Sequence, residues 1–228
     1  MKILCVIPAR GGSKGIEKKN IRKINNKPLI AYTIESTLSS KLFDDVIVST
    51  DDKEIAEISE SYGAKVPFIR PSELAQDDAT SDQAILHAVL EMQKLGSEYD
   101  VVVLRDCTVP FIDINDMKNM LDLFRKSDCN AVFGAIRAHP NPYFGMMECG
   151  GDGFLIPSKT LEKETTRRQD APIVYDVDGI FILDNKNFLK TKKIFSGKIL
   201  PYEISKEHGH MIDFEFDFRV AELLLKNN

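Results

Sequence analysis

The sequence has few cysteines, no long apolar run and no excess of positive charge, and each absence excludes a class of protein. The 4 cysteines among 228 residues are scattered and form no Cys-x-x-Cys pair, so neither a disulfide framework nor a zinc site is expected. No apolar stretch approaches the roughly 18 residues of a membrane-spanning helix. The formal net charge of −5 argues against nucleic acid as the main partner, because proteins that bind phosphate backbones usually carry a basic excess.

Length and composition are those of an ordinary globular protein. Hydrophobic residues make up 43% of the chain and charged residues 29%. A chain of 228 residues is long enough to bury roughly 70–75% of its unfolded surface, so we expect residues 1–228 to form a single domain. The N-terminus carries no apolar leader of the secretory type. We therefore expect a cytoplasmic protein whose partners are neither membranes nor nucleic acids.

The first twenty residues are the most informative stretch of the chain. Residues 2–7 form a continuous apolar run that ends at Pro8, which predicts a buried parallel strand. The loop that follows has three glycines, and Arg10, Lys14 and Lys19 bring positive charge to it. Glycines allow backbone N–H groups to approach a ligand closely. The stretch therefore predicts a polyphosphate site, although its spacing matches neither a Walker A loop nor a dinucleotide fingerprint.

Apolar runs alternate with helical patterns along the first half of the chain. The pattern predicts strands at 2–7, 45–50, 66–69 and 101–104 and helices at 28–40, 53–62 and 81–94. This alternation is typical of a parallel sheet covered by helices on both faces, with ligands at the carboxyl ends of the strands. Arg10, Asp51, Arg70 and Arg105 all follow predicted strands, so we expect them to gather at one edge of the sheet.

The second half is regular only in part. A helix is predicted at 113–126, a strand at 131–136, a core strand at 180–183 and a final helix at 219–226. Between them, residues 137–175 are rich in proline, glycine and charge and show little periodicity. A compact domain rarely carries such a long irregular segment without a function. We interpret residues 137–175 as an inserted arm.

Three motifs resemble one enzyme family. The string Ile-Pro-Ala-Arg-Gly-Gly-Ser-Lys-Gly-Ile-x-x-Lys-Asn-Ile at residues 7–21 is similar to the CMP-sialic acid synthetase (acylneuraminate cytidylyltransferase) family, which includes legionaminate and pseudaminate relatives. Residues 68–81 match the family pattern Arg-Pro-x-x-Leu-Ala-x-Asp-x-x-x-Ser, and residues 166–175 match Arg-Arg-Gln-Asp-x-Pro-x-Val-Tyr. The resemblance implies a three-layer α/β/α, Rossmann-like nucleotidyltransferase fold with a mostly parallel mixed sheet.

The same resemblance implies an activity and an assembly. CMP would pass from CTP to an acidic nonulosonate sugar of the sialic, legionaminic or pseudaminic type, with release of pyrophosphate. The chain would form a homodimer through the arm, which would place basic residues in the partner's site. The implied substrates are CTP and an acidic sugar, and the implied cofactor is Mg²⁺ or Mn²⁺.

The family motifs also imply site residues. Lys19 would lie beside the α-phosphate, and Arg10 with the backbone of residues 11–13 would hold the other phosphates. The implied nucleotide-binding residues are Ala9, Arg10, Gly11, Gly12, Ser13, Lys19, Asn20, Arg70 and Ser81. The implied sugar-binding residues are Arg105, Arg167, Arg168, Gln169 and Tyr175. Ser81 is also a candidate N-cap of the helix at 81–94.

Two motifs depart from the family. Where sialate-type members have Leu-Gln-Pro-Thr-Ser-Pro-Leu-Arg, this chain has an altered segment at 104–111, with Arg105 in place of a glutamine associated with the sugar. Asp106 resembles an aspartate of the wider superfamily that contacts the metal. Near the C-terminus, Met211 replaces the first of two family aspartates and Asp213 matches the second. We therefore hypothesise a metal site built from Asp106 and Asp213, which would act in catalysis together with Lys19 and Arg10.

Several alternatives remain open from the sequence. Asp106 could simply cap a turn. The acceptor could be a Kdo-like or phosphorylated sugar, because the departures lie on the sugar side of the motifs. Met211 makes a non-catalytic nucleotide-binding homologue conceivable. A glycosyltransferase is disfavoured, since no Asp-x-Asp follows the core strands.

Overall fold

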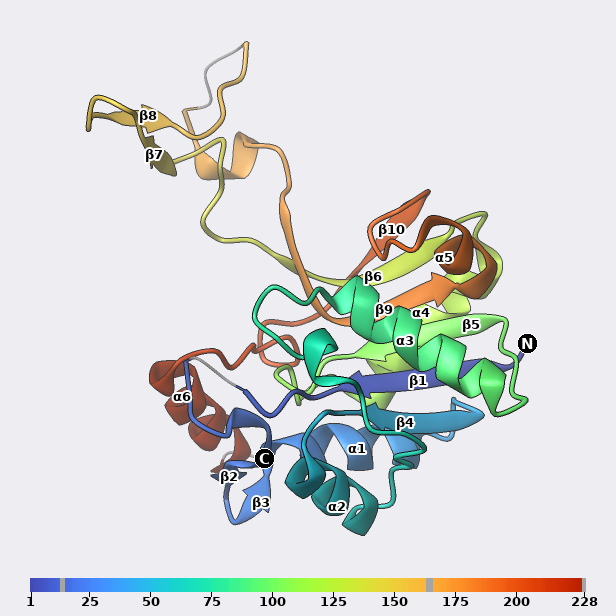
Figure 1. Ribbon diagram of the computed structural model, residues 1–228. Coiled ribbons are helices and arrows are strands. Elements are labelled where there is room, and N and C mark those ends of the chain that lie inside the picture. The colour runs from blue at the N-terminus through green and yellow to red at the C-terminus, as the bar shows by residue number, and fades with distance from the viewer. Residues whose placement is uncertain (13–14, 163–165, 227–228) are drawn as a thin grey trace.

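The computed structural model describes residues 1–12, 15–162 and 166–226. Within these residues, a six-stranded sheet has the order β10-β6-β9-β5-β1-β4 (Figure 1). Its strands are β1 (Ile3–Pro8), β4 (Asp45–Ser49), β5 (Val101–Arg105), β6 (Ala131–Arg137), β9 (Tyr175–Asp184) and β10 (Ile199–Glu203). β9 pairs antiparallel with β5 and β6, while the other pairings are parallel. The sheet is therefore mixed and mostly parallel, as predicted.

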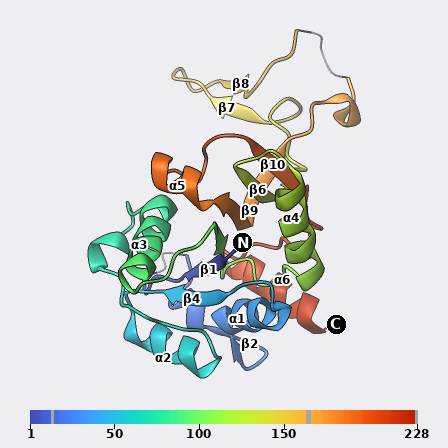
Figure 2. The same ribbon diagram turned by 90° about the vertical axis from the view of Figure 1, so that its right-hand side faces the viewer.

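Helices cover both faces of the sheet. One face packs against α1 (Leu29–Ser40), α2 (Lys53–Ser61) and α4 (Ile114–Lys126), and the other against α3 (Ser81–Lys94) and α5 (Asn185–Thr191). Alternate residues of β1 enter the two cores: Cys5 lies with α1 and α4, whereas Val6 lies with α3. Figure 2 shows α3 and α4 on opposite sides of the sheet. The predicted three-layer α/β/α architecture is confirmed.

Side-chain caps fix the first residues of α2 and α3. Asp52 accepts hydrogen bonds from the N–H groups of Glu54 and Ile55 at the start of α2, at 2.7 and 3.2 Å. Thr80 forms a capping box with Gln83 at the start of α3. The prediction that Ser81 caps this helix is therefore wrong: Ser81 is its first helical residue, and the residue before it has the extended backbone and the hydroxyl that an N-cap needs.

Other boundaries also differ from the sequence prediction. The predicted strand at 66–69 is absent, and Lys65 makes only a single bridge to Ile47. Pro67 in this segment has no N–H to continue a ladder. The final helix, α6 (Glu215–Lys226), begins four residues earlier than predicted. The sequence patterns did not reveal α5 or β10.

The N-terminal and C-terminal parts of the chain meet beside the sheet. A 3₁₀ turn, η1 (Lys19–Ile21), leads into a small hairpin formed by β2 (Lys23–Ile24) and β3 (Lys27–Pro28), and α6 lies near it. Ile16, Ile212 and Phe218 share one small core. The guanidinium of Arg22 stacks on the Phe218 ring at 4.2 Å. This core brings residues 15–21 and 210–214 to the same edge of the sheet.

The segment between β6 and β9 leaves the body of the molecule. It contains a two-stranded hairpin, β7 (Met147–Cys149) and β8 (Leu155–Pro157), and a short turn, η3 (Arg168–Asp170). Both views show it projecting away from the sheet (Figures 1 and 2). Phe154 and Leu155 are 73% and 65% exposed, so the arm presents apolar side chains to solvent. Among the described residues, no helix is long and apolar enough to cross a membrane.

Candidate active site

A cavity of about 510 Å³ opens at the carboxyl ends of the central strands. Cationic and acidic side chains from distant parts of the chain line it together. The residues that the argument uses are Arg10, Gly15, Lys19, Asn20, Arg70, Ser81, Asp106, Thr108, Asp213 and Phe214. The carboxyl edge of a mostly parallel sheet is where this architecture places its ligands.

The turn after β1 is held close to the second βα unit. Ala9 donates its N–H to the Ser49 carbonyl at 3.0 Å, and Gly11 donates its N–H to Asp51 Oδ1 at 3.0 Å. A Cβ at Gly11 would lie 2.7 Å from an Asp52 carboxylate oxygen, so a larger residue would push the turn outward. Gly12 has open space around it. Ser13, which the motif also implicates, and Lys14 lie outside the described residues.

Arg10 reaches across the cavity. Its Nη1 donates to the Gln76 carbonyl at 3.1 Å and lies 3.2 Å from Asp77 Oδ1. Asn20 is buried and donates to the Arg10 carbonyl at 2.9 Å, which fixes the backbone of this residue. A phosphate that binds the Arg10 guanidinium would therefore displace the Asp77 carboxylate from it. Asn20 thus has a structural role in addition to lining the cavity.

Arg70 offers an unused donor. Its side chain is 4% exposed, and its Nη2 lies 3.8 Å from Asp51 Oδ1. Burial lowers the pKa of Arg70. Its Nε is buried and has no hydrogen-bond partner among the described residues. A buried donor of this kind is costly unless a ligand or water satisfies it, so Arg70 is well placed to bind the nucleotide, as its motif implies.

Lys19 joins the two ends of the chain. Its Nζ donates to the Ile212 carbonyl and to Asp213 Oδ1, both at 2.9 Å. The approach is possible because Gly15 has no side chain: a Cβ there would lie 2.4 Å from the Asp213 carbonyl oxygen. The Lys19 side chain is 14% exposed. This places an ammonium group and a carboxylate side by side at the wall of the cavity.

Two carboxylates, those of Asp106 and Asp213, line the cavity. Asp106 Oδ1 accepts hydrogen bonds from the N–H and hydroxyl of Thr108, at 2.8 and 2.9 Å. Asp106 therefore does cap a turn, and it lines the cavity as well. Burial, and next the charge of Asp106, raise the pKa of Asp178 to about 6, and Asp213 contributes in the same direction. A hard divalent cation would relieve this repulsion, so the oxygen donors of Asp106 and Asp213 fit Mg²⁺.

One predicted sugar-binding residue, Arg105, is placed differently from the sequence expectation. Arg105 has no exposed surface, and its Nη1 donates to the carbonyls of Asp106, Val109 and Gly179 at 2.9, 2.7 and 3.3 Å. We correct the prediction that it contacts the sugar, because its guanidinium points into the protein. Burial lowers its pKa to about 10, so it stays charged at neutral pH. Met211 packs against the main core.

The arm residues lie apart from this cavity. Arg168 and Gln169 line a second cavity of about 510 Å³ at the foot of the arm. The Arg168 guanidinium lies 2.6 Å from His139 Nε2, and the Tyr175 hydroxyl donates to Glu203 at 3.2 Å. Arg167 is exposed. Within one chain, the structure does not bring the predicted sugar-binding residues together with the nucleotide-binding ones.

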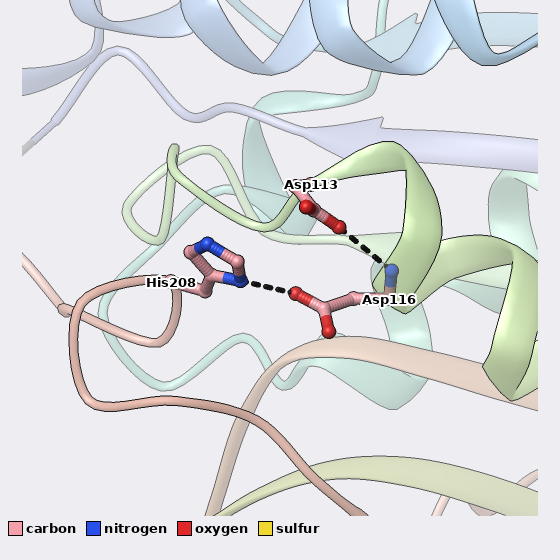
Figure 3. A group of neighbouring side chains, drawn as sticks. All are labelled: Asp113, Asp116 and His208. Carbon is pink, nitrogen blue, oxygen red and sulfur yellow. Dashed lines mark hydrogen bonds and ion pairs between the residues drawn. The ribbon is translucent and has the colours of Figure 1, made fainter. Parts of the chain in front are cut away.

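One cluster near the site was not anticipated from the sequence. Asp113, Asp116 and His208 offer ligand atoms within 4.8 Å of one another (Figure 3). Each already has a partner: Asp113 caps α4 by accepting from the Asp116 N–H at 2.7 Å, and His208 Nδ1 lies 2.6 Å from Asp116 Oδ2. The cluster thus ties the segment before Asp213 to the start of α4. An aspartate before a helical pattern was the only signal for it.

The fold is that of the nucleotidyltransferases. A solved structure of CMP:2-keto-3-deoxy-manno-octonic acid synthetase complexed with CTP superposes on 100% of this chain and 99% of that chain, with a TM-score of 0.73 and 16% sequence identity. The model of the cytidylyltransferase family matches residues 4–222. The chain therefore belongs to the cytidylyltransferase family, and the prediction of a nucleotidyltransferase enzyme is confirmed.

Relatives cover the chain almost from end to end. The post-translational flagellin modification protein B of Campylobacter coli is 34% identical over 99% of this chain and 95% of its own length. A pseudaminic acid cytidylyltransferase of Campylobacter jejuni is 35% identical over 100% of this chain and 98% of its own length. A CMP-N,N'-diacetyllegionaminic acid synthase of the same species is 34% identical over 98% of this chain and 95% of its own length. The resemblance stated from the sequence motifs is confirmed.

The raised pKa of Asp178 predicts a pH-dependent stability. A carboxyl with a pKa of about 6 in the folded state binds its proton more tightly when folded, so the free energy of unfolding falls as the pH rises through about 4 to 6. Asp178→Asn keeps an acceptor for the Gly179 N–H. We expect it to raise the free energy of unfolding by about 2 kcal/mol at pH 7 and to have almost no effect near pH 3.

Urea unfolding at both pH values measures this effect. Glu57→Gln, at an exposed position of α2, is the matched control and should change little at either pH. An equal gain in the free energy of unfolding from Asp178→Asn at both pH values would show that ionisation of this carboxyl does not destabilise the fold.

Proposed function

We propose that the protein transfers CMP from CTP to an acidic nonulosonate sugar and releases pyrophosphate. The observation that carries the proposal is the cavity in which Arg10 and Gly15 of the loop after β1, Lys19, and the carboxylates of Asp106 and Asp213 meet. Relatives named for pseudaminic and legionaminic acid match the chain at 34–35% identity over nearly its whole length. CTP is a cytoplasmic nucleotide, and we propose the cytoplasm as the place of the reaction.

The cations of the cavity suit a nucleoside triphosphate. In this proposal the N–H groups of the turn and Arg10 hold the β- and γ-phosphates. Lys19 lies beside the α-phosphate, and Arg70 and Ser81 contact the cytidine. A sugar hydroxyl attacks the α-phosphorus, the bond to the bridging oxygen breaks and pyrophosphate leaves. The protein contributes alignment and positive charge, since negative charge grows on the phosphate oxygens during the transfer.

Mg²⁺, or Mn²⁺, is the proposed cofactor. Asp106 and Asp213 would hold it, and it would supply charge neutralisation at the phosphate oxygens. Asp213 also accepts a hydrogen bond from Lys19, and Asp106 from Thr108, so both carboxylates are oriented by the protein before any metal binds. Met211, which packs against the core, leaves Asp106 as the replacement for the missing family aspartate.

The acceptor carboxylate is assigned to the arm. Arg167, Arg168, Gln169 and Tyr175 are the proposed sugar-binding residues, and adjacent arginines suit bidentate capture of a carboxylate. Because Arg168 and Gln169 line a different cavity from Lys19 within one chain, this assignment requires a second subunit. A Kdo-like acceptor remains the second candidate, which the fold of the CMP:2-keto-3-deoxy-manno-octonic acid synthetase favours.

We propose a homodimer formed through the arm. Arm residues Phe154, Leu155 and Ile156 are 51–73% exposed, and a surface of this kind favours association. The arm projects from the sheet far enough to offer itself to a second chain (Figure 1). An intersubunit site would explain why the two groups of predicted residues lie apart in one chain.

Pyrophosphate release from CTP tests the activity. We expect Mg²⁺-dependent release with an acidic acceptor in a panel of sialate, legionaminate, pseudaminate and Kdo, and none without acceptor. Asp106→Ala and Asp213→Ala should each lower turnover by roughly 100-fold or more, because a ligand of the metal that would neutralise the phosphate oxygens is lost. Asp122→Ala, on the surface of α4, is the control. Full turnover in Asp106→Ala would refute its metal role, and no release with any acceptor would favour the non-catalytic alternative.

Light scattering after size exclusion tests the dimer. The wild type should elute at twice the chain mass of 25.7 kDa. Leu155→Glu places a charge on the exposed arm and should shift the protein to the monomer mass and abolish sugar-dependent release. Leu95→Glu, at a 61% exposed position outside the arm, should leave both unchanged. A monomeric wild type that is fully active would contradict the proposed assembly.

A further inference from the structure

We propose that Arg105 is a positioning residue that fixes the two cavity carboxylates Asp106 and Asp213 through the turn that follows β5. This inference rests on the proposed function, because it concerns the residues that would hold the metal. It assigns to Arg105 a role that differs from contact with the sugar.

The guanidinium closes the turn from inside the protein. A single nitrogen, Nη1, donates to the carbonyls of Asp106 and Val109 at the two ends of the turn, and to Gly179 on the neighbouring strand at 3.3 Å. The Asp106 N–H donates to the same Gly179 carbonyl at 2.8 Å. Because Arg105 has no exposed surface, solvent does not compete for these contacts.

Packing leaves the turn little freedom. Gly179 has a φ of +79°, and a Cβ there would lie 2.7 Å from Ile112 and 2.9 Å from Val109. The side chains of the turn therefore fill the space that this glycine leaves open. Together with the Arg105 contacts, this packing sets the direction in which Asp106 enters the cavity.

The turn after β5 also fixes the position of the second carboxylate, Asp213. Ile212 donates its N–H to the Thr108 carbonyl at 2.9 Å. This hydrogen bond holds the segment just before Asp213 in place. Thr108 also donates to Asp106 Oδ1 through its N–H and its hydroxyl. One turn therefore orients both carboxylates, and Arg105 is the buried residue that holds the turn.

Stability alone does not account for an arginine at this place. Its Nε and Nη2 are buried and have no hydrogen-bond partner in the part of the chain that the structure describes. Unpaired buried donors and a desolvated charge are costly, and an apolar side chain of similar volume is often equally stable or more stable. The arrangement is explained if the positive charge and the three carbonyl contacts serve the carboxylates next to them.

Mn²⁺ binding to the CTP complex, followed by electron paramagnetic resonance, tests the role without turnover. Arg105→Met removes the charge and the donors and should weaken Mn²⁺ binding by roughly 10–100-fold, the usual effect of a lost outer contact. Arg105→Lys keeps the charge without the fork of donors and should fall between Arg105→Met and wild type. It also reports on the role if Arg105→Met does not fold.

Val102→Ala is the matched control. Val102 is fully buried in the same strand but belongs to the core on the other face of the sheet. It should lower the melting temperature and leave Mn²⁺ affinity within about twofold of wild type. Arg105 variants that lower only the melting temperature, with unchanged Mn²⁺ affinity, would overturn the inference. A wild type that releases pyrophosphate while the Arg105 variants bind Mn²⁺ normally would refute the inference alone, whereas an inactive wild type that binds no Mn²⁺ would refute the proposed function as well.

Discussion

The site depends on one contact between segments 194 residues apart, the hydrogen-bonded ion pair of Lys19 and Asp213. Two further features of the structure support this contact. Gly15 permits the approach, since any side chain there would collide with the Asp213 carbonyl. The small core of Ile16, Ile212 and Phe218 holds the two segments together behind the pair. A polyphosphate cradle at the start of the chain thereby acquires a carboxylate from its end.

The reversed strand β9 gives the site its second half. Because β9 lies between β5 and β6 and runs opposite to them, its Asp178–Gly179 segment meets the turn that follows β5. Asp106 and Asp213 line the cavity here, together with the cationic side chains of Arg10, Lys19 and Arg70. Burial, and next the negative charge of Asp106, raise the pKa of Asp178 in this segment. This combination fits a triphosphate held by the cationic side chains and a metal ion between phosphate and carboxylate.

The sequence could predict those features that depend on residues close to one another in the chain. The buried run and glycines of residues 2–15 have a short-range signature, and the alternation of helical and apolar patterns was enough for the three layers. The orientation of Arg105 was beyond reach, because whether an arginine after a strand turns inward depends on carbonyls contributed by β9. The predicted strand at 66–69 failed for a local reason, because Pro67 has no N–H to continue a ladder. α5 and β10 are short and lack a strong period of their own.

The central claim is that a nucleoside triphosphate binds at the glycine turn, and a crystal structure with CTP and Mg²⁺ tests it most directly. The account predicts the triphosphate against Gly11 and Gly12, with Arg10 released from Asp77 and Lys19 beside the α-phosphate. Nucleotide bound elsewhere, with the turn empty and Arg10 still paired to Asp77, would contradict it.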